Sequence, residues 1–140
     1  MARCDPKNVA VEWLDAYEAG SLDLIVAMHS SDAAIECACG DSKKKIQGRR
    51  DISEYWRHRL IESPALGLDV LRADDRVATL SYRTGNEIVE AVLDVSNEGL
   101  ITRCRCGPAG HLRANIDWPY VLSLAAILTM TAVCILLFAI

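Results

Sequence analysis

Charged side chains are absent from residues 118–140, although Asp, Glu, Lys and Arg make up 24% of the chain. A helix rises about 1.5 Å per residue, so this stretch would span about 34 Å, enough to cross the roughly 30 Å hydrocarbon core of a bilayer. Trp118 and Tyr120 lie at its upstream edge, where aromatic rings favour the headgroup layer. So long an apolar run exceeds what a small core covers. The missing charge therefore predicts a transmembrane tail anchor at residues 118–140, joined by a linker at 109–117.

An apolar segment is also missing from the N-terminal residues MARCDPKN, so we expect no cleavable signal peptide. Arg103, Arg105 and Arg113 lie upstream of the uncharged run, and no positive charge follows it. The positive-inside rule then places the preceding domain on the cytoplasmic side of a membrane that the chain crosses once. In that reducing compartment, structural disulfides among the six cysteines are not expected.

A basic surplus is lacking as well. The net charge is −4, and every charged residue lies before residue 118. Domains that bind nucleic acids usually carry an excess of Lys and Arg, so no nucleic-acid partner is expected. The roughly 117 residues before the tail suffice for one domain with its own core and not for two. We therefore expect a single folded domain over residues 1–108.

Hydrophobic spacing in this domain changes from helical to alternating near residue 65. Asp5 and Pro6 suit the N-cap and first position of a helix, which Gly20 ends. Asp51 and Glu54 form a capping-box pattern for a later helix. The expected order is a helix before Gly20, a short helix after Ser21, strands at 33–39 and around Ile46, and a helix that starts at Asp51 and ends before Pro64. An alternating strand through Leu66, Leu68 and Val70 follows, then a turn at Asp74 and Asp75, and strands from 76 to 84, 87 to 95 and 100 to 106. This pattern predicts an α+β domain with three helices on one face of a curved sheet.

Two segments resemble the NTF2-like, or SnoaL-like, superfamily. AYEAGSLDLIVAMHSSDAAIEC resembles the end of that family's first helix, its second helix and its first strand, and IQGRRDISEYWRHRL resembles its third helix. The resemblance covers roughly residues 8–107. It implies a cone-shaped fold, in which a curved mixed sheet and three helices enclose a pocket. This fold hosts enzymes as well as plain binding modules, so the resemblance alone does not assign an activity.

Ketosteroid isomerase, an enzyme of this superfamily, depends on a tyrosine and two aspartates. Alignment with the family places Trp13, Cys37 and Ala91 at those three positions. Tryptophan donates only through its indole N–H, and alanine has no side-chain donor. Steroid isomerase activity is therefore not expected. Asp32, His29 and His58 remain as material for a His–Asp pair, and the sequence places none of them inside the pocket.

Two Cys-x-Cys pairs are the most unusual chemical feature of the domain. Side chains two apart on a strand share a face, so Cys37 with Cys39, and Cys104 with Cys106, each point one way. The resemblance makes their strands neighbours, so four thiols are expected to converge. They offer a metal site, with zinc as the default ion, a reactive cysteine, foremost Cys37, or small buried hydrophobes. Structural zinc sites prefer wider spacing, so no cofactor is predicted.

The expected pocket suits a small hydrophobic ligand better than acid–base catalysis, because its lining is mostly apolar. If the cone is open, the residues expected to line it are Trp13, Tyr17, Cys37, Trp56, Cys104 and Cys106. Aromatic side chains on the first and third helices more often complete a core than contact a ligand. The first hypothesis is therefore a non-catalytic ligand-binding module held at a membrane. The alternatives are an enzyme that uses Cys37 or an ordered water on a lipophilic substrate, and an interaction module that forms homodimers.

A cluster of positive charge lies between the expected first strand and third helix. Lys43, Lys44, Lys45, Arg49 and Arg50 carry it, with Asp41 and Asp51 close in sequence. Each such residue attracts an anionic lipid surface by about 1 kcal/mol. The cluster therefore indicates a contact with lipid headgroups, an anionic ligand at the rim of the cone, or a solvated hairpin.

Overall fold

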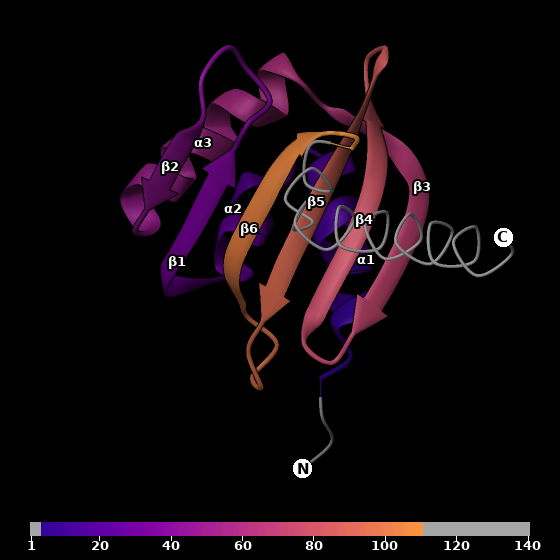
Figure 1. Ribbon diagram of the computed structural model, residues 1–140. Helices are drawn as coiled ribbons and strands as arrows, with labels where there is room; N and C mark the ends of the chain where they lie inside the picture. Colours follow the sequence, from indigo (N-terminus) through magenta and orange to yellow (C-terminus); the bar gives the residue numbers. More distant parts are fainter. Residues whose placement is uncertain (1–3, 111–140) are drawn as a thin grey trace, which may run out of the picture.

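The structure, a computed structural model, describes residues 4–110 (Figure 1). These residues form three helices and six strands: α1 (Pro6–Glu18), α2 (Leu22–Ala27), β1 (His29–Cys37), β2 (Lys44–Gln47), α3 (Arg49–Glu62), β3 (Ala65–Asp74), β4 (Val77–Thr84), β5 (Glu87–Val95) and β6 (Ile101–Pro108). The α+β class and the order of elements predicted from the sequence are confirmed.

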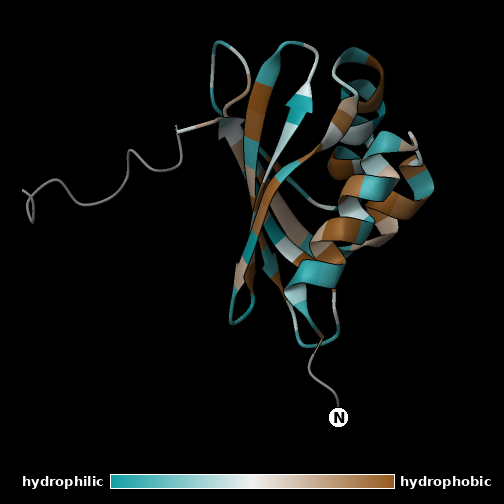
Figure 2. Cartoon of the chain, turned by 90° about the vertical axis from the view of Figure 1, so that its right-hand side faces the viewer, coloured by the Kyte–Doolittle hydropathy of each residue, from teal (hydrophilic) through white to brown (hydrophobic). Residues whose placement is uncertain are grey.

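The strands form one mixed sheet in the order β2-β1-β6-β5-β4-β3. Strands β1 and β6 are parallel neighbours, and every other pair in this sheet is antiparallel. The sheet curves, and all three helices of the described chain cover one of its faces (Figure 2). Helix α1 packs on β3 and β4, whereas α3 packs on β1 and β2. The pairing of β1 with β6 brings the two Cys-x-Cys segments side by side.

Helix α1 begins as the sequence predicts. The Asp5 side chain accepts a hydrogen bond from the Lys7 backbone N–H at 2.9 Å, with Pro6 at the first helical position. The capping box predicted for the third helix is wrong. Helix α3 begins at Arg49 after Gly48, whose φ of 88° belongs to the left-handed region that glycine tolerates. Asp51 therefore lies inside the first turn rather than at the cap.

Strand β1 differs from its predicted range of 33–39 at both ends. It begins at His29, where β6 already offers Ile101 as a partner, and it ends at Cys37. Ala38 still donates its N–H to the Cys106 carbonyl oxygen at 2.8 Å, but the chain then turns toward β2. Cys39 therefore lies beyond the strand, in the connection that follows it.

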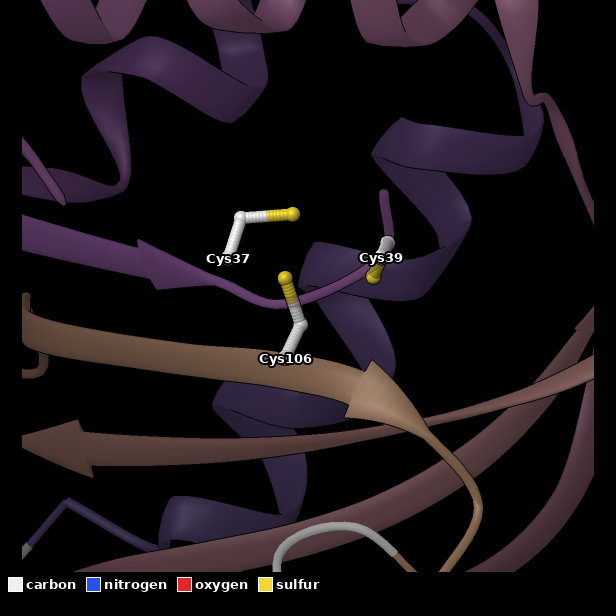
Figure 3. A group of neighbouring side chains, drawn as sticks. All are labelled: Cys37, Cys39 and Cys106. Carbon is white, nitrogen blue, oxygen red and sulfur yellow. The ribbon is translucent and has the colours of Figure 1, made fainter. Parts of the chain in front are cut away.

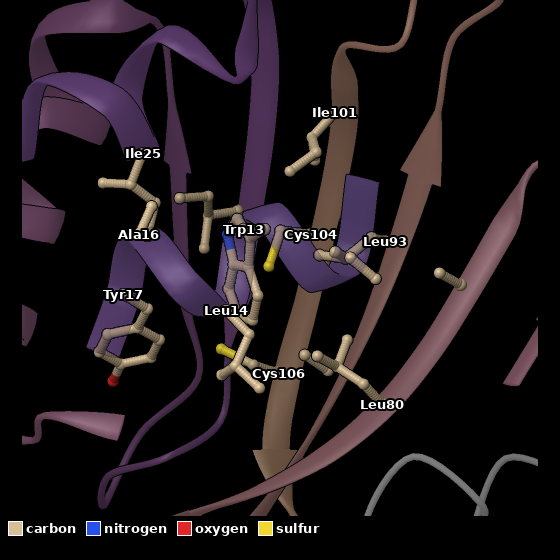
Figure 4. Close-up of a cluster of buried hydrophobic side chains, with 14 of the residues drawn as sticks. Trp13, Leu14, Ala16, Tyr17, Ile25, Leu80, Leu93, Ile101, Cys104 and Cys106 are labelled. Atoms are coloured by element: carbon tan, nitrogen blue, oxygen red, sulfur yellow. The ribbon is translucent and has the colours of Figure 1, made fainter. Parts of the chain in front are cut away.

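The space between α1 and the sheet is filled by aromatic side chains. Trp13 is fully buried and makes edge-to-face contacts with three rings, at centroid distances of 5.6–5.7 Å. Those partners are Tyr17, Trp56 and Tyr82, each at most 2% exposed. Aliphatic side chains of α1, α2, β4, β5 and β6 surround them (Figure 4). The interior of the cone is a packed core.

Within residues 4–110, no helix is long and apolar enough to cross a bilayer. The predicted tail anchor at 118–140 lies outside the described residues. So does the predicted linker from residue 111 onward, and residues 109 and 110 form a turn after β6.

Candidate functional site

The structure separates the six residues expected to line a pocket. Trp13, Tyr17 and Trp56 pack against one another in the core, with the Tyr17 and Trp56 rings 5.1 Å apart. Their exposed fractions of 0%, 0% and 2% leave no surface for a ligand from solvent. The tryptophans and the tyrosine ring therefore stabilise the fold, and the tyrosine hydroxyl is the part that reaches the edge of the core.

Cys104 also belongs to the core. In the parallel pairing of β1 and β6 it lies opposite Ile35, and on its other side it lies opposite Leu93 of β5. Its side chain is 1% exposed and points among the apolar residues drawn in Figure 4. The alternation of β6 was predicted correctly, because Cys104 and Cys106 face inward whereas Arg103 faces solvent. Cys104 and Cys106 interact with one another, but only Cys106 also reaches the thiols of Cys37 and Cys39.

Three thiols do converge, at the end of β1. The Sγ atoms of Cys37, Cys39 and Cys106 all lie within 4.8 Å of one another (Figure 3). Cys37 and Cys106 are register partners across the parallel strands. Cys39 reaches the same point from the connection after β1. We call these three residues the thiol cluster. The sequence predicted four thiols, and Cys104 is not part of the cluster because it lies two residues deeper along β6.

Next to the thiol cluster, a pocket of about 630 Å³ opens between β2, α3 and the end of β1. We call it the rim pocket. Its lining combines thiols, both charge signs and a few apolar groups. The lining residues are Cys37, Cys39, Gly40, Ser42, Lys44, Lys45, Ile46, Asp51, Glu54, Tyr55, His58, Arg59, Glu62 and Ser63. Of the six residues expected from the sequence, only Cys37 lines it.

Arg59 is the cation that lies deepest in the rim pocket. It is half-buried, and its Nε donates a hydrogen bond to the Tyr17 hydroxyl at 3.1 Å. That hydroxyl in turn donates to the Ser63 carbonyl oxygen at 2.5 Å. No carboxylate within residues 4–110 forms an ion pair with Arg59. By contrast, the exposed Arg57 lies 2.7 Å from Glu54, which His58 also contacts.

Burial and the neighbouring charges change several pKa values around Arg59. Burial raises the pKa of Tyr17 to about 12, although the Arg59 charge opposes this shift. Burial also raises the pKa of Tyr55, whose hydroxyl lies 3.6 Å from the Cys106 Sγ. Both phenols therefore stay neutral near pH 7 and act as hydrogen-bonding groups.

The pKa values of the three thiols in the cluster are shifted in different directions. Hydrogen bonds from the Cys106 and Cys39 thiols lower the pKa of Cys37 well below its ordinary value. Hydrogen bonds within the cluster raise the pKa of Cys39, and bonds to Cys104 and Cys37 raise that of Cys106. Within the cluster, these hydrogen bonds favour negative charge on Cys37 over the other two thiols.

The two histidines and Asp32 do not form a catalytic pair. His29 is 2% exposed and donates through Nδ1 to the Ile25 carbonyl oxygen at 2.8 Å. Its Nε2 has no partner within the described residues, and burial lowers its pKa. Asp32 accepts a bond from Ser30 on the surface, and His58 pairs with Glu54 at the rim. None of the three pairs with another, and His58, which the sequence did not place in a pocket, lines the rim pocket.

The sequence reasoning missed Arg59 and Tyr55 as site residues. They are four residues apart on α3, and such a pair shares one face of a helix. Helix α3 packs on β1, the strand on which Cys37 was expected to face inward. The spacing of Tyr55 and Arg59 could therefore have indicated that both face the same pocket as Cys37. Lys44 and Lys45 were noted for their charge, and the structure adds that both line the rim pocket.

Comparison with known proteins gives the fold. No protein-family model matches the sequence, and no curated protein does. Among solved structures, a SnoaL-like protein from Burkholderia thailandensis is similar, with a TM-score of 0.65 and 17% identity over 75% of this chain and 95% of that one. The chain has an NTF2-like fold. A ketosteroid isomerase-like protein from Kribbella flavida gives a TM-score of 0.62 and 19% identity over 74% of this chain and 76% of that one. At these identities the likeness concerns the NTF2-like fold alone.

Proposed function

We propose that this NTF2-like domain binds a small molecule, with an apolar body and one anionic group, in the rim pocket. The observation that carries the proposal is Arg59, a half-buried guanidinium without a carboxylate partner among residues 4–110. Partial burial weakens the hydration of a charge, so an anion that enters the pocket gains a strong interaction. A guanidinium binds carboxylate or phosphate oxygens through two parallel hydrogen bonds.

The size and lining of the rim pocket support this ligand class. A volume of about 630 Å³ lies within the range of roughly 300–1,000 Å³ that is typical of small-molecule sites. Ile46 and the Tyr55 ring offer apolar contact, while Lys44 and Lys45 add positive charge on the β2 side. The sequence suggested a purely hydrophobic ligand, because the aromatic side chains were expected to line the pocket. Since they fill the core instead, the proposed ligand is amphipathic.

The predicted tail anchor is a second, independent argument for an amphipathic ligand. If residues 118–140 cross a bilayer, the NTF2-like domain stays next to a reservoir of lipophilic anions, such as fatty acids. The proposed role is therefore that of a membrane-attached binding module on the cytoplasmic side, without a catalytic step of its own.

A second candidate function is thiol-dependent catalysis. It is favoured by Cys37, which lines the rim pocket and whose pKa the neighbouring thiols lower. A thiolate at the floor of a pocket attacks electrophilic ligands. Reaction of Cys37 with a carboxylate-bearing chloroacetamide much faster than with the neutral amide would support this candidate. Equal and slow reaction with both would leave the binding role alone.

The binding proposal is tested on the full-length chain in detergent micelles, with EDTA present to exclude metal ions. Carboxylates from benzoate to dodecanoate are titrated beside the alcohols of matching length. We expect at least one carboxylate to bind tenfold or more tightly than its alcohol, a difference of about 1.4 kcal/mol. This preference should disappear in Arg59→Gln.

Arg57→Gln is the matched control, because Arg57 lies on the same helix, carries the same charge and does not line the rim pocket. It should keep the preference for the carboxylate. The proposal is overturned if no carboxylate binds better than its alcohol, or if Arg57→Gln and Arg59→Gln lose the preference equally.

A further inference from the structure

The thiol cluster is not explained by the binding of an organic anion. Two of its members, Cys37 and Cys106, are buried, and Cys39 is half-buried beside the rim pocket. Cysteine is a common buried residue, so one such side chain needs no function. Here, three Sγ atoms lie within 4.8 Å of one another, although they come from β1, β6 and the connection after β1. Three sulfur atoms this close together can bind a single metal ion.

We propose that Cys37, Cys39 and Cys106 bind one Zn²⁺ ion as three thiolate ligands, with the fourth position open to the rim pocket. Zinc takes thiolate ligands in a tetrahedral arrangement at about 2.3 Å, which corresponds to about 3.8 Å between sulfur atoms. The separations of up to 4.8 Å exceed this by at most about 1 Å. Rotation of cysteine side chains closes such a gap without a change in the fold.

The backbone fixes the positions of two of the three cysteines more firmly than that of the third. Cys37 and Cys106 are fixed by the parallel pairing of their strands, and the Ala38 N–H bond to the Cys106 carbonyl oxygen extends that pairing by one residue. Cys39 lies beyond the strand and beside Gly40, so its backbone is not held by the sheet. Two ligands are therefore positioned in advance, and the third is able to move toward the ion.

The fourth ligand of the zinc ion is not a cysteine of the sheet. Cys104 lies opposite Ile35, in the core, and does not belong to the cluster. Cys37 and Cys39 both line the rim pocket, which gives the ion a route from solvent and leaves room for a water molecule. Three protein ligands and an open position are the arrangement of zinc sites that bind an exchangeable ligand.

Charge at the site favours the bound ion. Binding converts the thiols to thiolates and releases their protons, so three thiolates and Zn²⁺ carry a net charge of −1. The Arg59 guanidinium is close enough to Cys39 to interact with its charge, and it offsets this negative group. Arg59 has five N–H donors, so it serves both the metal site and an anion in the pocket. The zinc proposal does not rest on the organic ligand.

The test uses the full-length chain, reduced and in detergent, on a Cys4→Ser, Cys134→Ser background that leaves only the four cysteines of the two Cys-x-Cys pairs. Zinc alone is titrated, and Co²⁺ serves as a spectroscopic substitute. We expect one ion per chain, an intense thiolate-to-cobalt charge-transfer band and the strong visible absorption of tetrahedral cobalt. Cys39→Ser should weaken zinc binding at least a hundredfold, because it removes a ligand.

Cys104→Ser is the matched control, since Cys104 is buried on the same strand as Cys106 but lies outside the cluster. It should keep the stoichiometry and the cobalt spectrum. Cys39 is only half-buried, so Cys39→Ser is expected to fold, and circular dichroism checks this. The proposal is overturned if the reduced chain binds no stoichiometric zinc, if Cys39→Ser binds as tightly as the background, or if Cys104→Ser loses the site equally. Formation of a Cys37–Cys106 disulfide by a chain that binds no metal when reduced would also overturn it.

Discussion

The two halves of the space between helices and sheet are used differently. Between α1 and strand β4, the rings of Trp13, Tyr17 and Tyr82 pack edge to face, and each is at most 1% exposed. Between α3 and the ends of β1 and β2, the same space opens into a pocket of about 630 Å³ with thiols, an arginine and several other charged side chains. The NTF2-like fold is thus filled by a packed core in one half and open, with charged and thiol side chains, in the other.

Tyr17 marks the boundary between these halves. Its ring belongs to the aromatic core, whereas its hydroxyl bonds Arg59 and the Ser63 carbonyl oxygen. An inward-facing residue of this fold is therefore not by itself a pocket residue. An inward-facing residue belongs to the core where its neighbours are large enough to fill the cone around it, and it lines a pocket where they are not.

Trp13→Ala should produce the largest change, and it should act on stability. Trp13 is fully buried and contacts three other rings, so its truncation leaves a cavity in the core. We expect a loss of about 3–5 kcal/mol in the free energy of unfolding, measured by urea denaturation. Val11→Ala, on the exposed side of the same helix, should stay within about 0.5 kcal/mol. Similar losses for both variants would contradict a core centred on Trp13.

Tyr17→Phe should have a moderate effect on both halves. It keeps the ring but removes the hydroxyl that bonds Ser63 and Arg59, so about 0.5–1.5 kcal/mol of stability should be lost. The preference for a carboxylate over its alcohol should weaken less than in Arg59→Gln, because the guanidinium remains. Titration calorimetry with the tightest carboxylate measures this. A loss as large as that of Arg59→Gln would mean that the hydroxyl itself binds the anion.

Acidification should destabilise the fold through His29, which is buried at the start of β1. Burial lowers the pKa of His29 in the folded chain below the ordinary value of 6.5, so the unfolded chain binds the proton more readily. The stability is fully present above about pH 6.5 and falls as the pH drops below that value. Urea midpoints at pH 7.5 and pH 5.5 should show this decrease, and His29→Gln should reduce it. His58→Gln, at an exposed position, should leave it unchanged, and equal effects of the two variants would contradict the assignment.

Lys45→Gln should give the smallest change. Lys45 lines the rim pocket but is exposed, and exposed charge pairs contribute about 0.2–1 kcal/mol. Carboxylate affinity should therefore fall by less than about fivefold, and the difference should shrink at high salt. Lys43→Gln, which alters an exposed lysine outside the pocket lining, is the control. A tenfold loss in Lys45→Gln would mean that the β2 side holds the anion more strongly than Arg59.

The sequence allowed much of the fold to be predicted, because local signals and the family resemblance agreed. Asp5 with Pro6 began α1 as expected, and the alternation after residue 65 predicted the antiparallel strands. The capping pattern at Asp51 misled because the helix begins earlier, directly after Gly48, whose positive φ is a backbone conformation that glycine tolerates. Local capping rules do not rank such competing signals.

The site was predictable only in part. The pairing of Cys37 with Cys106 followed from the resemblance, but the position of Cys39 depended on where β1 ends, which a turn at Gly40 decides. Trp13 and Trp56 were expected to line a pocket only if the cone is open, because an inward aromatic residue on these helices more often completes a core. Whether the cone is filled depends on packing between distant segments, and no single segment of the sequence carries that information.

Site-resolved alkylation of the cysteines tests most directly whether the chemistry lies at the rim and the core is closed. The full-length chain, reduced and free of metal, is treated with iodoacetamide, and labelling at each cysteine is followed by peptide mass spectrometry. We expect Cys37 and Cys39 to react in the folded chain, because both line the rim pocket, while Cys104 stays protected until denaturant unfolds the core. Labelling of Cys104 as fast as Cys39 would contradict this account and indicate an open cone.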